Sequence, residues 1–138
     1  MNNEVITQAA EILAAAEYCA LALIDAEGYP TAATITPSKT KGIEWIAFGT
    51  GLGSNWAKRI EKCNRASVCC NSAKHNITLV GTIDVVTDLA TRKEMWYAGL
   101  ENHFSGPEDP GFCVLRFNTK RYSLLMLGEK VEEASGTL

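Results

Sequence analysis

The sequence has little of what metal centres and disulfide frameworks need. It holds two histidines, and neither stands at a metal-ligand spacing from cysteines or carboxylates. Its five cysteines are an odd number without a Cys-x-x-Cys pair. The adjacent Cys69 and Cys70 would point to opposite faces of a strand, which suits neither a shared metal nor a disulfide between them. We therefore predict reduced, structural thiols and no metal site.

Strong charge and long apolar runs are also missing. The formal net charge of −3 over 138 residues argues against nucleic acid as the main partner, because phosphate binding needs a concentrated Lys/Arg surface. No apolar run approaches the roughly 18 residues of a membrane span. The first residues lack the basic segment and apolar core of a secretory signal. We expect a cytoplasmic protein with a single domain over residues 1–138.

Hydrophobic periodicity predicts a mostly β domain with flanking helices. An i, i+3/i+4, i+7 stripe favours a first helix, and a bend at Gly81 would curl the sheet. The expected helices cover residues 4–17, 55–63 and 89–98, the last ended by Gly99. The expected strands cover 19–24, 31–36 and 43–48 as a meander with a turn at 38–42, then 66–71, 76–87, 112–117 and 122–127. Residues 129–138 are expected to form a flexible tail. The sum is a six- to seven-stranded antiparallel barrel.

The segment from Gly49 to Lys58 carries the clearest functional pattern. Three glycines within five residues precede Ser54, which opens a helix. Gly51 and Gly53 would let the backbone approach a ligand, and the free amides of Asn55 and Trp56 would attract an anion such as a phosphate. The alternative is a tight turn in which Ser54 serves only as a helix cap.

No acid–base pair, catalytic triad or metal set is evident in the sequence. Asp84 and Glu94 are acid–base candidates, but a solvated face explains both equally well. If the protein is an enzyme, a cofactor must therefore supply the chemistry. Aromatic residues near His103 and Phe104 would either stack on a planar ring at the mouth of the barrel or form a small core under their own loop.

The order of these pieces resembles the pyridoxamine 5′-phosphate oxidase-like flavin-binding split barrels, in particular the small members labelled general stress proteins. The resemblance runs from the first helix to about Leu127. The segments that carry it are ALIDAEGYP (22–30), WIAFGT (45–50) followed by Ser54, NRASV (64–68), ITLVGT (77–82), and EMW (94–96) through FCVLRF (112–117).

The resemblance implies a split barrel that forms a homodimer, with FMN in clefts at the interface. It places the flavin ring along the second and third expected strands. It places the phosphate at the glycine-rich junction that begins the helix expected at 55–63. Asn76 falls where relatives have a polar side chain that reaches the flavin. The implied cofactor-binding residues are Thr34, Ile35, Thr36, Phe48, Gly49, Thr50, Ser54, Asn55, Lys58 and Asn76.

Two functions follow as hypotheses. One is an FMN-dependent oxidoreductase of unknown substrate. The other is a stress-response protein that holds a flavin or related phosphate ligand without turnover. The second is favoured because Ala33 and Ser38 stand where relatives with strong FMN binding carry basic residues. Lys58 or Arg59 would then be the nearest replacement cations. The chain also lacks the C-terminal substrate motif of true pyridoxamine-phosphate oxidases.

Overall fold

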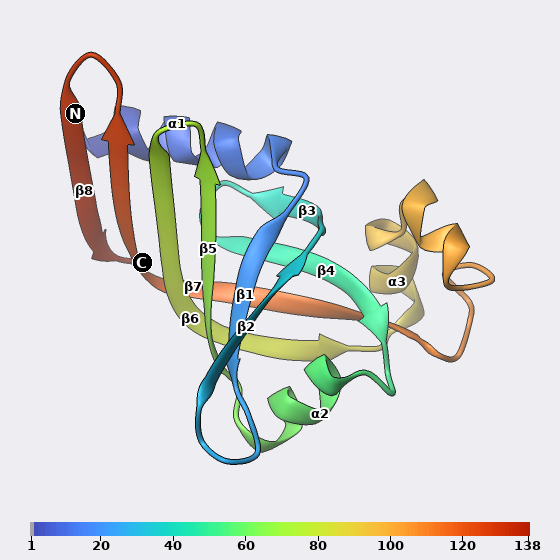
Figure 1. The fold of residues 1–138 in the computed structure, drawn as a ribbon. Coiled ribbons are helices and arrows are strands. Elements are labelled where there is room, and N and C mark those ends of the chain that lie inside the picture. The colour runs from blue at the N-terminus through green and yellow to red at the C-terminus, as the bar shows by residue number, and fades with distance from the viewer. Residues whose placement is uncertain (1) are drawn as a thin grey trace.

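The computed structural model describes residues 2–138, and it contains one strongly curled antiparallel sheet with helices at its ends and side (Figure 1). The elements run in the order α1 (Asn2–Ala15), β1 (Cys19–Ile24), β2 (Pro30–Ile35), β3 (Pro37–Lys41), β4 (Trp45–Gly51), α2 (Asn55–Lys62), β5 (Arg65–Ser72), β6 (His75–Val86), α3 (Leu89–Met95), a 3₁₀ turn η1 (Ala98–Asn102), β7 (Phe112–Leu127) and β8 (Val131–Thr137).

The strand order explains why the barrel is split. The sheet runs β2-β1-β5-β6-β7-β4-β3, and β8 pairs with the second half of β7. The edge strands β2 and β3 follow one another in the chain, yet they do not pair with each other. The expected meander is therefore wrong beyond its first hairpin, because β4 pairs with β3 and β7 instead of β2. The mostly β split barrel with flanking helices is confirmed.

Two strands were missed and two expected strands are one, so the described residues contain eight strands. The turn expected at 38–42 is strand β3 as far as Lys41, and Gly42 with φ of 54° makes the actual turn. The expected flexible tail is wrong as well, because β8 pairs along β7 from Leu127 to Arg121. Ala134 of β8 is buried against the core, which fixes this strand despite its acidic, polar composition.

The bend predicted at Gly81 is confirmed, and it shapes the whole sheet. The β6–β7 pairing shifts between Val80 and Gly81, so Lys120 of β7 has no partner in β6. A β-carbon on Gly81 would lie 1.9 Å from the carbonyl oxygen of Asn118. Because the bulge absorbs the extra residue, the two strands expected at 112–117 and 122–127 are one continuous strand.

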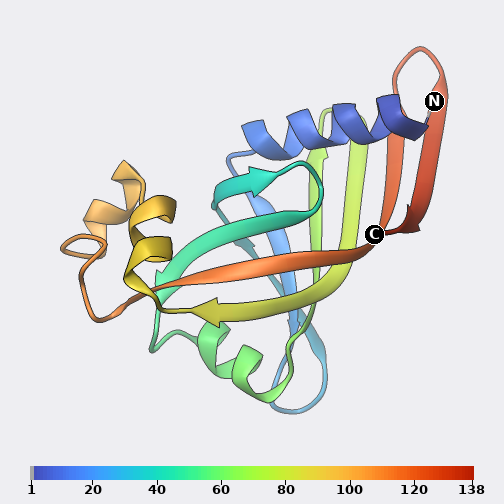
Figure 2. The same ribbon diagram turned by 180° about the vertical axis from the view of Figure 1, so that it is seen from behind.

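Two apolar clusters hold the fold together. The larger fills the barrel and includes Leu13 and its neighbours on one face of α1, which lies across one end of the barrel (Figure 2). The smaller lies between α3, η1 and the strands β4 and β7, around Leu100 and Phe112. Helix α3 ends at Met95, before the expected end at Gly99, because the backbone becomes extended at Trp96. The Trp96 ring packs edge-on against Phe112, with 5.2 Å between the ring centroids.

No helix among residues 2–138 is long and apolar enough to cross a bilayer.

Candidate functional site

A cavity of about 480 Å³ at the end of β4 brings together four of the predicted site residues, Ile35, Thr36, Gly49 and Thr50. We call it the β4 cavity. Its volume lies in the range of about 300–1,000 Å³ typical of small-molecule sites. The remaining lining residues are Gly51 of β4 and a cover formed by Tyr97, Gly99, Leu100, His103 and Phe104.

Missing side chains on β4 create part of this space. A β-carbon on Gly49 would lie 2.9 Å from a methyl carbon of Leu100 and 3.0 Å from the Phe112 ring. Gly49 therefore lets η1 and the small core approach β4 closely. A β-carbon on Gly51 would lie 3.8 Å from the Phe104 ring, at the cavity wall, without a clash. The two glycines thus have different roles, one in packing and one at the cavity surface.

The cover of the cavity belongs to the small core as well as to the site. Phe104 packs against Phe112 at 5.2 Å between ring centroids, and Leu100 is buried. The small core expected as the plainer alternative is therefore present, and the same segment presents Tyr97, His103 and Phe104 to the cavity. Burial raises the pKa of the Tyr97 phenol, which favours the protonated form that can donate a hydrogen bond.

The loop behind the cover is tied down by Asp109. Its carboxylate accepts hydrogen bonds from the amides of Ser105 at 3.0 Å and Gly111 at 2.9 Å. These bonds lower the pKa of the Asp109 carboxyl. The guanidinium of Arg92 donates to the carbonyl of Asp109 at 3.1 Å, and Leu52 donates to the carbonyl of Gly111 at 2.9 Å. The loop at 105–111 is therefore fastened to both α3 and the end of β4.

The predicted anion site begins one tight turn beyond the cavity. The amide of Ser54 donates to the carbonyl of Gly51 at 3.1 Å, and its hydroxyl accepts from the amide of Ala57 at 3.2 Å. The helix cap predicted for Ser54 is confirmed. The amides of Asn55 and Trp56 begin α2 and so have no acceptor within the helix, and they carry the positive end of its dipole.

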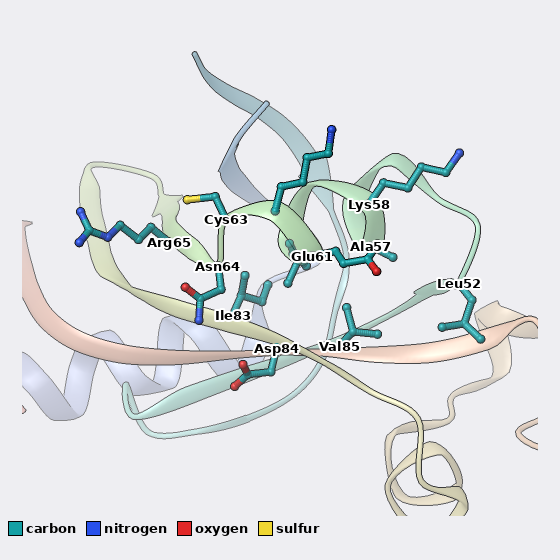
Figure 3. A pocket seen from close by; sticks show the side chains of 12 residues that line it. Leu52, Ala57, Lys58, Glu61, Cys63, Asn64, Arg65, Ile83, Asp84 and Val85 are labelled. Carbon is teal, nitrogen blue, oxygen red and sulfur yellow. The ribbon is translucent and has the colours of Figure 1, made fainter. Parts of the chain in front are cut away.

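Lys58 lies one helical turn beyond these amides, between two further cavities. One of about 480 Å³ separates α2 from the β1–β2 turn and is lined by Asn55, Lys58, Arg59 and Asp25, among others. The other, of about 780 Å³, lies between α2 and β6 (Figure 3). In Figure 3, Ile83 and Val85 point toward α2, while Lys58 and Arg65 extend outward. The cavity between α2 and β6 therefore has apolar side chains on its strand side, and the charged ends of Lys58 and Arg65 lie at its rim.

The other predicted residues lie apart from the β4 cavity. The Phe48 side chain is fully buried in the barrel core, so only its backbone is close to the cavity. Thr34 is exposed on β2. Asn76 lies on the outer face of β6, where its side chain donates to the Thr78 hydroxyl at 3.2 Å and accepts from the Cys69 thiol at 3.4 Å. Within a single chain, Asn76 therefore lies away from the other predicted site residues.

The acid–base candidates do not form a pair. Asp84 is exposed and accepts a hydrogen bond from the Asn118 amide at 3.4 Å, and Glu94 is exposed on α3. His75 accepts from the amide of Leu127 at 3.0 Å, as expected of a histidine that packs against a strand. Tyr97 and His103 line the β4 cavity, although the resemblance does not place them among the cofactor-binding residues. The aromatic loop that contains them was predicted either to cover a planar ring or to form a small core, and its composition was the available signal.

Residues 4–123 match the family described as "Pyridoxamine 5′-phosphate oxidase like". The chain belongs to this family. A comparison with curated proteins found no match.

Solved structures of other proteins share the fold of this chain. A Clostridium acetobutylicum protein related to general stress protein 26 is 18% identical, with a TM-score of 0.84 over 100% of this chain and 97% of that one. A Nostoc punctiforme protein described as FMN binding is 17% identical, with a TM-score of 0.70 over 99% and 94%. A heme binding protein from Mycobacterium smegmatis is 19% identical, with a TM-score of 0.75 over 96% of this chain and 57% of that one. At these identities the likeness shows the fold alone.

Proposed function

We propose that this family member binds FMN and acts as an oxidoreductase, with the flavin ring in the β4 cavity and the phosphate at the start of α2. The observation that carries the proposal is the β4 cavity itself, which joins a glycine-containing strand end to an aromatic cover one turn before a helix N-terminus. The family and an FMN-binding relative of the same fold support the choice of ligand.

The residues at the cavity fit the ring of a flavin. Its lining contains no carboxylate, lysine or arginine and offers the hydroxyls of Thr36 and Thr50 with the rings of Tyr97 and Phe104. Planar heteroaromatic rings stack on such side chains, and hydroxyls provide orienting hydrogen bonds. Bound FMN would supply hydride and electron transfer. The residues of this chain would hold the ring and exclude water from one of its faces.

The phosphate end has fewer cations than the resemblance leads one to expect. The hydroxyl of Ser38 donates to the carbonyl of Met95, so this side chain serves the packing of α3. Ala33 offers no charge. The helix amides at Asn55 and Trp56, with Lys58 on the next turn, are the phosphate-binding groups that remain. We therefore expect FMN binding that depends strongly on the helix N-terminus.

A second copy of the chain would complete the site. The outer face of β2, β1, the middle of β5 and the first half of β6 carries short, uncharged side chains, namely Ala20, Ala22, Ala32, Thr34, Ser67, Cys69, Thr78 and Val80. The edge strand β2 has four exposed residues out of six and no charged residue, although charged side chains are the usual protection of an edge strand. Burial of this face in a homodimer would explain both features. It would also bring the partner's copy of Asn76 or Thr34 toward a site from which they are separated in one chain.

The first test is FMN titration of a cavity-filling variant with a matched control. Gly51→Val places methyl groups at the Phe104 wall, whereas Gly128→Val adds the same side chain far from the cavity, where nothing lies within 4 Å. We expect Gly51→Val to raise the Kd for FMN about tenfold or more, equivalent to about 1.4 kcal/mol, and Gly128→Val to leave it unchanged. Equal affinities of both variants and the wild type would place the flavin elsewhere.

The second test separates the phosphate site from helix capping. Asp is as good an N-cap as Ser, so Ser54→Asp should preserve stability while its carboxylate repels the phosphate. Ser54→Ala should do the reverse, lowering stability by about 1 kcal/mol with a smaller effect on FMN. FMN binding that is as tight in Ser54→Asp as in the wild type would contradict the proposed phosphate position.

A non-catalytic flavin- or phosphate-binding protein is the second candidate, because the lining of the β4 cavity contains no carboxylate, lysine or arginine. The two functions differ in one measurement on FMN-loaded protein. Bleaching of the flavin absorbance by a reduced nicotinamide, followed by recovery in air, supports the oxidoreductase. A flavin that stays oxidised with every nicotinamide and small reductant tested supports the binding protein. Parallel titration with heme tests the ligand named for the mycobacterial relative.

A further inference from the structure

Two buried cysteines face each other across the strands β1 and β5. The antiparallel ladder pairs Leu21 with Val68 and ends with Ala20 opposite Cys69. Its register, continued by one residue, puts Cys19 opposite Cys70, and the two thiols are in contact. Both side chains point into the barrel core, where Cys19 is 2% and Cys70 is 3% exposed. The two thiols are free in this structure.

The register meets the geometric requirement of a disulfide. Directly opposed residues of an antiparallel pair have α-carbons about 4.5–5.5 Å apart. Disulfides form across α-carbon distances of about 4.4–6.8 Å. Because Cys19 and Cys70 also share one face of the sheet, a bond between their sulfurs needs no rearrangement of either strand.

The pKa values of the two thiols are shifted in opposite directions, which gives the thiols different roles in a reaction. A hydrogen bond from the Cys19 thiol lowers the pKa of Cys70, against the opposing effect of burial. The same contact and burial raise the pKa of Cys19. Cys70 is therefore the thiol that ionises first and attacks an oxidant, and Cys19 is the neighbour that can close a disulfide.

A surface hollow lies beside this pair. The hollow has a volume of about 710 Å³ and lies between the end of α1 and residues close to the two cysteines in sequence, Tyr18, Asn71 and Ser72. The carbonyl of Tyr18, a residue that lines the hollow, accepts from the Cys70 thiol at 3.9 Å. Tyr18 itself is 62% exposed.

We propose that Cys19 and Cys70 form a reversible oxidation site that a small hydroperoxide converts into an intramolecular disulfide. The Cys70 thiolate attacks the peroxide, the O–O bond breaks, and water or an alcohol leaves with the proton, which gives a sulfenic acid on Cys70. The Cys19 sulfur then attacks the Cys70 sulfur and the S–O bond breaks with release of water. The thiol pair loses two electrons and two hydrogens, and the peroxide is reduced.

Cys69 provides an internal control because it points the other way. It is exposed on the outer face of the sheet, and its thiol donates to the Asn76 side chain. An adjacent strand residue cannot reach the core-facing sulfurs of its neighbours. The inference therefore requires that Cys69 be dispensable for the disulfide, even though it is the most exposed of these three thiols in the single chain.

The experiment is peptide mapping by mass spectrometry after treatment of the folded protein with stoichiometric hydrogen peroxide, then blocking of free thiols. We expect the wild type and Cys69→Ser to give a peptide pair linked through residues 19 and 70, with a mass lower by two hydrogens and restored by dithiothreitol. Cys70→Ser should lose the link. Cys19→Ser should leave a sulfenic acid on Cys70 that a dimedone-type reagent traps.

Protein unfolded in urea serves as the reference for unselective pairing of the five cysteines. The same distribution of links in folded and unfolded protein would overturn the inference. So would a link that requires Cys69, or folded wild type whose Cys19 and Cys70 are still free thiols after the peroxide treatment. The wild type and Cys69→Ser decide the outcome even if the two core variants fail to fold, and none of these results depends on flavin binding.

Discussion

Substitution of Gly81 by Ala tests the bend that closes the barrel. The new β-carbon would lie 1.9 Å from the Asn118 oxygen, 2.9 Å from its carbonyl carbon and 3.1 Å from the Lys120 nitrogen. Carbon and oxygen atoms normally approach to about 3.3 Å, so the backbone of β7 must move by more than about 1 Å. All three contacts are with backbone atoms, which cannot rotate away as the end of a side chain can.

The surroundings of the bulge resist this movement. The Thr119 amide donates to the carbonyl of Glu44 at 2.9 Å, and the Thr119 hydroxyl donates to the carbonyl of Ile43 at 2.6 Å. The Lys120 carbonyl accepts from the Leu138 amide at 2.9 Å. Overpacking costs about 1–3 kcal/mol, and each hydrogen bond lost adds about 1 kcal/mol. We expect Gly81→Ala to lower the free energy of unfolding by about 3–5 kcal/mol.

Urea denaturation followed by tryptophan fluorescence measures this change. Gly128→Ala is the matched control, since a β-carbon there would meet nothing within 4 Å. The control should fall within about 0.5 kcal/mol of the wild type. A Gly81→Ala protein that differs from the control by less than about 1 kcal/mol would refute the conclusion that a close backbone approach requires glycine at the bend.

Three further predictions concern the proposed dimer interface, the loop at 105–111 and strand β8. Thr34→Glu should leave the folded monomer intact because Thr34 is exposed, but convert the proposed dimer to a monomer in light scattering; a wild type that is already monomeric would contradict the proposed interface. Asp109 has a lowered pKa in the folded state, so its contribution to stability is complete above its unfolded pKa of about 3.9 and is lost as the pH falls through the lower folded value. Asp109→Asn should therefore be less stable than the wild type at pH 7 and show a smaller loss between pH 5 and pH 2 in denaturation experiments; identical acid profiles would show that the carboxylate does not fasten the loop. Ala134→Asp should destabilise by about 2 kcal/mol or more because it buries a charge, whereas Ser135→Asp on the exposed face should have little effect; equal stability of the two would mean that β8 does not pack on the core.

The geometry of the candidate site could be predicted from the sequence only in part. The glycine-rich junction and the Ser54 cap depend on local backbone chemistry, and both are found where the pattern indicated. The contribution of Tyr97 and His103 to the same cavity depends on how α3 and η1 pack across β4, over a separation of almost fifty residues. Nothing local in those residues distinguishes a small core from a cavity wall, and the structure shows that they serve as both.

The sequence by itself determined the elements whose signals are local. The β1–β2 hairpin follows from the turn at Gly28 with φ of 89°, the sheet curvature from Gly81, and the family from the order of short segments along the chain. Tertiary structure alone decided the rest. A polar strand such as β8 forms because β7 offers it a free edge, and Cys19 meets Cys70 because β5 pairs with β1 across some fifty residues. Pairing partners are chosen by the competition of all strands for edges and core space, and a local pattern cannot encode that competition.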